Sequence, residues 1–309
     1  MLNLKKLLKI YKLLNSKNSK LNPNFAFSLV EISIVILVIG ILIAGITNGM
    51  DLYRDYRVEM AKQITQKSRV ATMKNLVLWF ESSQKSSFEP KNIGSETKIT
   101  KWKNITPNLF GKLDADLVSG ASGPIYRENI HSSLSGIYFT KDENNCLSVP
   151  AGYDSGSTEN SAFILLKLDK ANTDNTRILS TWNSSRQYWY ELRHNAWGSG
   201  YADGASNFLI NVAVSNNGDY SKNKAELINY QQKPDLIKLY LNKSLQPDPT
   251  SYSAPSYSYQ GAQLTIGCKL GVGTGYPSAY ILELIVFDRY LKDNERKIVE
   301  DYLYKKWNL

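Results

Sequence analysis

The sequence predicts a mainly β protein with a long N-terminal helix, and three observations carry that prediction. Ile32–Ile46 reads ISIVILVIGILIAGI, in which Ser33 is the only polar residue, and Leu29 and Val30 precede it. About ten short apolar or alternating segments follow, separated by Gly, Asn, Asp, Ser and Pro. Such a series is typical of a β-sandwich or jelly roll. The last segment, Lys292–Trp307, has the periodicity of a short C-terminal helix.

The apolar segment approaches the roughly 20 residues with which a helix crosses a bilayer. Its length favours a helix over a buried strand, although many of its residues are β-branched. Lysines precede it, so the positive-inside rule places residues 1–26 in the cytoplasm and the bulk of the chain outside. A secretory signal peptide, with Ile43-Ala44-Gly45 as a loose cleavage site, and a simple single-pass anchor are the alternatives. Asp51–Leu78 lacks proline and keeps apolar residues at helical spacing, which predicts that the helix continues.

Composition and charge exclude some classes of function. The chain has 309 residues, of which 42% are hydrophobic and 21% charged, as expected of a globular protein. Its net charge is +9, from 37 basic and 28 acidic residues, but residues 1–26 hold six lysines and no acid. The rest of the chain therefore carries 31 bases against 28 acids, and we expect no nucleic-acid partner. Two cysteines and two histidines are too few for a zinc site of the CxxC or HExxH type.

Glu31 lies inside the apolar run, where a carboxylate is costly and indicates a function. The residues Ala26-Phe27-Ser28-Leu29-Val30-Glu31 resemble the cleavage site of type IV prepilins. The resemblance implies that a prepilin peptidase cuts between Ala26 and Phe27, and that Phe27 becomes a methylated N-terminus. It also implies that Glu31, the fifth residue of the product, pairs with the amine of Phe27 in a neighbouring subunit. Ala26 stands where the family usually has glycine, and the leader is longer than most.

The predicted organisation is a basic leader over residues 1–26, a transmembrane and assembly helix with its stem over 27–74, and a β head over 75–309. In the head, Leu76–Ser83 and Leu282–Arg289, followed by Val299–Trp307 with its Lys-Trp pair, resemble concanavalin A-like (laminin G-like) jelly rolls. The resemblance implies a jelly-roll fold that ends in a helix. It says little about function, because one fold serves many functions.

Six residues are candidates for ligand binding in the head. They combine rings that could stack on a sugar with polar groups that could bind its hydroxyls: Trp182, Trp189, Tyr190, Trp197, Asp203 and Asn207. Asp203 and Asn207 could also add oxygens for a calcium ion, which some relatives use. The alternative is that the aromatic rings belong to the core of the sandwich.

The sequence predicts no catalytic site and no cofactor other than a possible calcium ion. Glycan-cleaving jelly rolls carry acids in an ExDxE-like spacing, which puts them on one face of a strand. That triplet does not occur in the sequence, and Asp114-Ala-Asp116 lies in a polar connection without a third acid. Cys146 and Cys268 could form a disulfide outside the cytoplasm, but their separation in space cannot be read from the sequence.

Together, these patterns predict a type IV pilin-like subunit, a minor pilin or pseudopilin, that is not an enzyme. The expected partners are other pilin subunits, a prepilin peptidase, the bacterial inner membrane and a glycan or surface protein. The expected location is the inner membrane before assembly and a periplasmic or cell-surface filament afterwards. The alternative is a single-pass, membrane-anchored lectin-like or glycan-processing protein that does not assemble.

Overall fold

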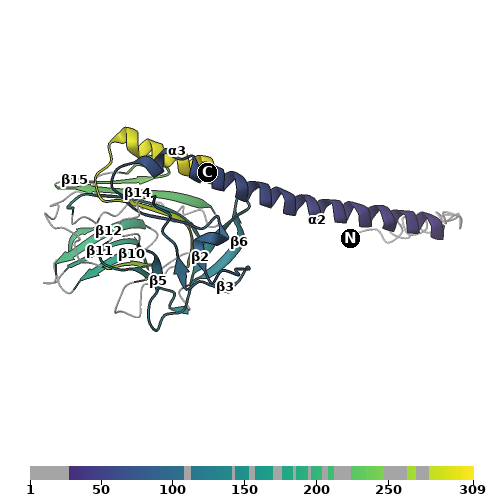
Figure 1. Cartoon of the computed structure of the whole chain (residues 1–309), viewed down its shortest axis with the longest axis horizontal. Coiled ribbons are helices and arrows are strands. Elements are labelled where there is room, and N and C mark those ends of the chain that lie inside the picture. Colours follow the sequence, from purple (N-terminus) through teal and green to yellow (C-terminus); the bar gives the residue numbers. More distant parts are fainter. Residues whose placement is uncertain are drawn as a thin grey trace, which may run out of the picture. The chain divides into compact units, whose positions relative to one another are not determined.

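The computed structural model describes residues 28–107, 113–140, 143–152, 157–169, 176–183, 186–193, 196–203, 208–211, 224–234, 236–246, 263–268 and 278–309 (Figure 1). The chain divides into two compact units, Met1–Tyr53 and Arg54–Leu309. The described part of the first unit is the beginning of helix α2 (Leu29–Gln66). The division lies within this helix, so residues 54–66 belong to the same unit as the sheets.

Short helices and strands follow α2 along the chain. They are η1 (Arg69–Thr72), β1 (Leu76–Glu81), η2 (Lys85–Ser87), β2 (Phe88–Glu89), β3 (Thr97–Lys98), β4 (Lys101–Trp102), β5 (Ala115–Leu117), β6 (Ile125–His131), β7 (Leu134–Phe139), β8 (Leu147–Val149), β9 (Asn160–Leu168), β10 (Thr176–Asn183), β11 (Arg186–Arg193), β12 (Ala196–Asp203), β13 (Phe208–Asn211), β14 (Ala225–Lys233), β15 (Leu236–Leu241), β16 (Ser244–Leu245), β17 (Gln263–Ile266), β18 (Ala279–Phe287) and α3 (Asp293–Trp307).

Among the described residues, the strands form two antiparallel sheets of nine strands each. Sheet A has the order β16-β15-β14-β9-β18-β7-β6-β3, and β1 pairs with β18 beside this path. Sheet B has the order β13-β12-β11-β10-β17-β8-β5-β4-β2. Strands far apart in sequence are neighbours in both sheets, as in jelly rolls and other sandwiches.

The two faces of sheet A are both covered, which explains why its central strands are apolar almost throughout. Along β9, Ala162, Ile164 and Leu166 join the core between the sheets, whereas Phe163 and Leu165 join a second core on the other face. The alternation follows from the two-residue period of a strand.

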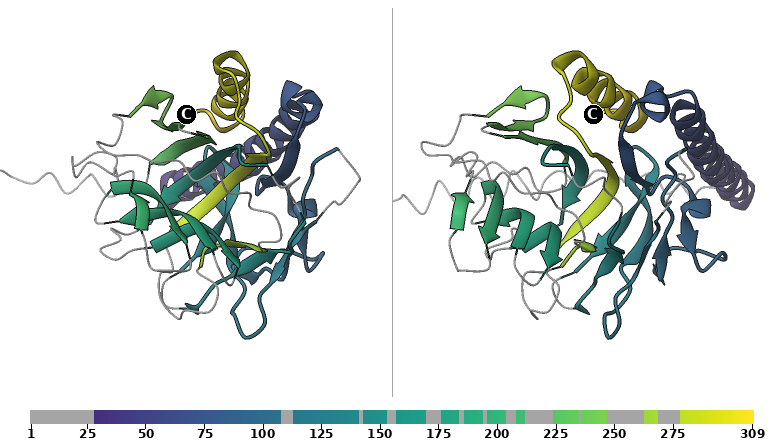
Figure 2. Two further views of the ribbon diagram at one scale, coloured as in Figure 1. Left: turned by 90° about the vertical axis from the view of Figure 1, so that its left-hand side faces the viewer. Right: turned by 60° about the vertical axis from the view of Figure 1, so that its left-hand side comes forward.

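Helix α3 and the second half of α2 cover that other face of sheet A (Figure 2). Ala61 of α2 and Val299, Leu303 and Trp307 of α3 pack in the same apolar cluster as residues of β1, β9 and β18. The second unit therefore has three layers: helices, sheet A and sheet B.

Helix α2 ends at Gln66, well before Leu78, where helical spacing in the sequence predicts its end. Ser68 caps the following η1, since its hydroxyl accepts a hydrogen bond from the backbone N–H of Val70 at 3.1 Å. Asn75 then takes a left-handed conformation, with φ of 60°, directly before β1. The local hydrogen bond of the Ser68 side chain and the left-handed backbone at Asn75 thus accompany the end of a helix that apolar periodicity alone would extend.

The predicted fold class is confirmed: a long N-terminal helix, an antiparallel β-sandwich and a short C-terminal helix. Among the described residues, one helix near the N-terminus is long and apolar enough to cross a membrane, judged by length and composition.

Candidate functional site

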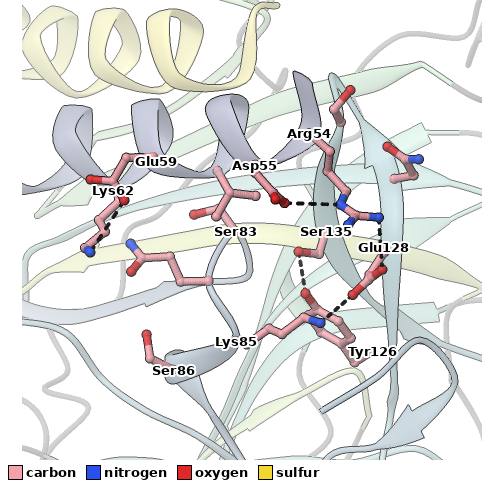
Figure 3. A pocket seen from close by; sticks show the side chains of 14 residues that line it. Arg54, Asp55, Glu59, Lys62, Ser83, Lys85, Ser86, Tyr126, Glu128 and Ser135 are labelled. Atoms are coloured by element: carbon pink, nitrogen blue, oxygen red, sulfur yellow. Dashed lines mark hydrogen bonds and ion pairs between the residues drawn. The ribbon is translucent and has the colours of Figure 1, made fainter. Parts of the chain in front are cut away.

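A polar pocket of about 420 Å³ opens beside the head-bound part of α2. Three segments line it: residues 54–62 of α2, residues 83–86 around the start of η2, and residues 126–135 of the β6–β7 hairpin (Figure 3). The register of sheet A and the packing of α2 on that sheet bring these distant segments together.

Acids and bases alternate around the pocket. The carboxylate of Glu128 lies 2.6 Å from the ammonium of Lys85 and 3.9 Å from the guanidinium of Arg54 (Figure 3). Arg54 also lies 3.7 Å from Asp55. These groups are partly exposed, so their ion pairs contribute little to the stability of the fold. The same side chains present hydrogen-bond donors and acceptors to the pocket.

The inner wall of the pocket is built from buried hydroxyl groups. The Tyr126 hydroxyl donates to Ser135 Oγ at 2.8 Å, and burial raises the pKa of Tyr126. Ser83 and Gln84 donate to the carboxylate of Glu81, at 2.9 and 2.6 Å. This wall is therefore held in place by a charged group that lies behind it.

Glu81 belongs to a buried cluster with Glu283 and Lys306. Glu81 of β1 and Glu283 of β18 are directly opposite each other in sheet A. Like charges in that position repel each other. The ammonium of Lys306, from α3, pairs with both carboxylates, and its nitrogen lies 2.9 Å from Glu283.

Neutral donors complete the cluster. Trp79 and Trp307 donate their indole N–H groups to Glu283, each at 2.7 Å, and the Tyr302 hydroxyl donates at 2.6 Å. Burial lowers the pKa of Lys306, but the attraction of Glu283 and Glu81 outweighs burial and the net shift is upward. Burial and the same two acids raise the pKa of Tyr302 well above its usual value. The ammonium and the phenol thus both keep their protons.

This arrangement can bind a polar ligand, because hydroxyl, amide, carboxylate and cationic groups lie close together in the pocket. Among the residues that line it, the three acids Asp55, Glu59 and Glu128 each have a basic neighbour within 4 Å. The cluster behind the wall is fully buried and has a structural role: it fixes α3 and β1 on β18.

The predicted aromatic site falls on β10, β11 and β12, where the backbone pairing is described and the side chains from 182 to 203 are not. Residues opposite each other in an antiparallel pair share a face of the sheet. Trp189 is opposite Ser180 and Gly200, and Trp182 is opposite Gln187, two residues before Trp189. Trp182 and Trp189 thus share the same alternation in the backbone register of sheet B.

The other candidates on these strands have the opposite alternation in the backbone register. Tyr190 is opposite Leu179, which is buried in the core between the sheets. Trp197 is opposite Leu192, two residues after Tyr190, and Asp203 shares the same alternation. This register of the backbone does not test the six candidates as a ligand site, which stays a prediction. Asn207 lies outside the described residues, and the calcium site stays a prediction.

The predicted processing residues Ala26 and Phe27 also lie outside the described residues. Glu31 is described, and its carboxylate accepts a hydrogen bond from the backbone N–H of Ser28 at 2.8 Å. The Ser28 hydroxyl accepts one from the N–H of Val30 at 3.2 Å. The two bonds cap the start of α2, and their S-x-x-E spacing is present in the sequence but did not enter the sequence prediction.

Cys146 and Cys268 are joined in a disulfide, with their Cα atoms 5.4 Å apart. They lie next to β8 and β17, which are neighbours in sheet B. Asp114 and Asp116 have structural partners: Asp114 accepts the backbone N–H of Asn104 at 2.9 Å, and Asp116 lies 2.8 Å from Lys101.

Sequence reasoning missed the pocket and the buried cluster. A usable signal was present for the cluster, since Glu81 ends and Glu283 interrupts an otherwise apolar strand. An acid in such a strand needs a buried partner. No local signal marks the pocket, because its three walls are far apart in sequence.

No protein-family model and no curated protein matches the sequence. The fold is similar to the binding domain of Paraclostridial Mosquitocidal Protein 1, with TM-score 0.55, 12% identity and coverage of 77% of this chain and 56% of that one. It is also similar to the receptor binding domain of Botulinum Neurotoxin Type G, with TM-score 0.50, 14% identity and coverage of 76% and 54%. This chain thus spans about half of each.

A third similar structure is a Trypanosoma rangeli sialidase in complex with sialic acid, with TM-score 0.48, 10% identity and coverage of 75% of this chain and 33% of that one. At these identities the likeness concerns the fold alone. The comparisons thus show a β-sandwich fold and no enzyme family.

Proposed function

We propose that this protein is a type IV pilin-like subunit, a minor pilin or pseudopilin, that displays a lectin-like head. The observation that carries the proposal is the continuity of α2. One helix includes the apolar segment and also the residues packed on the head. A cut before Phe27 would leave that helix in the product, free to anchor or assemble while the head stays outside.

Glu31 has a defined role in this proposal. In the single chain its carboxylate caps α2 through the N–H of Ser28. After cleavage, the new amine of Phe27 in a neighbouring subunit would provide a cationic partner. A buried carboxylate with such a partner recovers part of its cost of desolvation and sets the axial register between subunits. The partners are then a prepilin peptidase, other pilin subunits and the bacterial inner membrane.

The N-terminus of the purified full chain tests this function. We expect a mass that begins at Phe27, with one methyl group added. Replacing Ala26 by a bulky residue, as in Ala26→Leu, should leave the leader in place, whereas Glu31→Val should still be cut but should not enter filaments. A chain that keeps Met1, or that begins beyond Ile46, contradicts the proposal.

For the head, we propose a glycan or a protein surface as the ligand, bound on the face of sheet B that carries Trp182 and Trp189. Stacking of a sugar on an indole contributes about 1 kcal/mol or more, so Trp189→Ala should weaken binding to a glycan array at least about fivefold. Glu128→Gln is the matched variant in the polar pocket. A loss of glycan binding with Glu128→Gln alone would indicate that the ligand binds in the polar pocket. Unchanged binding with Trp189→Ala would refute the aromatic face as the binding site.

The alternative is a membrane-anchored lectin-like or glycan-processing protein that never assembles. The length and apolar character of α2 suffice for an anchor on their own. In that case the full chain remains in the membrane fraction as a monomer with an uncut leader. Turnover of a polysaccharide by the full chain would contradict the non-enzymatic function.

A further inference from the structure

A basic groove lies on the other flank of α2 from the polar pocket. Two adjoining hollows of about 480 and 600 Å³ form it, and they share Arg69 and Ile298. The residues of α2 that line the pocket are 54, 55, 58, 59 and 62, whereas those that line the groove are 60, 63 and 64. At 3.6 residues per turn these two sets face in nearly opposite directions.

The groove carries positive charge over an apolar floor. Among the described residues, five exposed cations that line it make no ion pair: Lys67, Arg69, Lys74, Lys292 and Lys305. The acids in its wall are already engaged, since Glu295 is held by Arg289 at 2.7 Å and Asp301 by Lys243 at 2.7 Å. The floor consists of partly buried apolar side chains: Met60, Ile64, Met73 and Ile298.

The complementary surface is on α2 of the chain itself. Asp55 and Glu59 are one helical turn apart, with side chains 73% and 55% exposed, and Tyr56 beside them is 57% exposed. We call residues 55, 56 and 59 the acidic face.

The basic side chains of this segment turn to the head. Arg57 donates to the carbonyl oxygens of Ser132 and Lys306 at 3.2 and 3.3 Å, and Arg54 lies 3.9 Å from Glu128. The exposed contacts of Asp55 and Glu59 with their basic neighbours, at 3.7 and 3.6 Å, are weak pairs of the kind that water and salt screen. The acidic face therefore stays negative and keeps an apolar edge.

We propose that the basic groove of one copy binds the acidic face of a second copy. Opposite charges and two apolar surfaces then meet, and charge complementarity of this kind fixes the register of a contact. Because the two surfaces lie on different flanks of one molecule, the contact is head-to-tail, and repeating it gives an open fibre or a ring. The inference rests on the proposed function and names a lateral contact for it.

Disulfide trapping between two tagged full-length copies in the membrane tests the contact. One copy carries Glu59→Cys and the other Arg69→Cys, and the native Cys146–Cys268 pair is kept. We expect a mixed-tag dimer in yield about fivefold above that of Glu59→Cys with Lys91→Cys. Lys91 is an exposed lysine that lines neither hollow. Equal yields from the two combinations overturn the inference.

Charge reversal gives an independent readout. Arg69→Glu with Lys74→Glu in both copies should lower co-purification of the two tags about tenfold, and adding Asp55→Lys with Glu59→Lys to both copies should restore it. A loss without restoration overturns the charge pairing, provided that near-UV spectra show all variants folded.

The N-terminus of the same samples separates the two proposals. A chain that begins at Phe27 but gives no excess of the mixed dimer refutes only the contact. A chain that keeps its leader and still gives the mixed dimer supports the contact and refutes the filament function.

Discussion

Lys306 occupies a position in which an unpaired ammonium would be very costly. Its side chain is fully buried, and two carboxylates that face each other across sheet A surround it. Removing the cation would leave the negative charges of Glu81 and Glu283 next to each other with no positive charge to balance them. A broken buried ion pair usually costs more than the intact pair contributes, because the remaining charge stays desolvated.

We expect Lys306→Met to lower the free energy of unfolding by about 3–5 kcal/mol. The matched control is the neighbour Lys305→Met, which is exposed and should change stability by less than about 0.5 kcal/mol. Thermal unfolding of the full chain in detergent, followed by near-UV circular dichroism, measures both. Equal effects of the two substitutions would show that the cluster does not carry this energy.

The pH dependence of that difference follows from the raised pKa of Lys306. A cation whose pKa is higher in the folded state stabilises fully below its unfolded value, about 10.4, and loses this effect as pH rises through the folded value. The stability gap between the natural chain and Lys306→Met should therefore be flat between pH 7 and 9 and should narrow only above about 10.4. If the difference in stability between the two chains narrows below pH 9, the raised pKa of Lys306 does not explain it.

At the scale of elements, the end of β17 must pass close to β7. Gly267, which follows β17, has φ of +77°, and a Cβ placed there would meet the ring of Phe139. Phe139 is fully buried in the core between the sheets. Only glycine leaves room for both the left-handed backbone and the ring.

Gly267→Ala should therefore destabilise by about 2–4 kcal/mol, from backbone strain and overpacking together. Gly120 is a matched control, since it also has φ of +77° but has no neighbour within 4 Å of an added Cβ. Gly120→Ala should cost only about 1 kcal/mol for strain. The melting temperatures of the two variants measure this difference. Equal decreases would show that the contact between the added methyl group and Phe139 does not destabilise the fold.

At the scale of the whole molecule, we expect the head outside the cytoplasm. The six lysines of residues 1–26 and the absence of acids there favour a cytoplasmic leader. The disulfide between Cys146 and Cys268 fits an oxidising compartment.

An alkaline phosphatase fused after Leu309 should accordingly be active. Replacing the leader lysines by glutamine should lower that activity, because the orientation signal is weakened. A reporter that is active only in the cytoplasm, fused at the same position, should stay silent. Activity of this second reporter would show the opposite orientation, with the head in the cytoplasm.

Local patterns allowed much of the fold to be predicted. The apolar run, the alternating strands such as those near β9 and β18, and the terminal helix all reflect periodicities of two or 3.6 residues, which a short window of sequence contains. The end of α2 at Gln66 was missed because capping by Ser68 competes with that periodicity.

The sequence by itself determined the apolar N-terminal helix, the β class of the head and the motif around Glu31. Only the tertiary structure decided that Lys306 meets Glu81, a residue 225 positions away, and that the backbone of Trp189 pairs with Ser180 and Gly200 in sheet B. The physical reason is that periodicity is a local property of the chain. Strand order and register decide which distant side chains meet, and a shift of one residue would send each side chain to the other face.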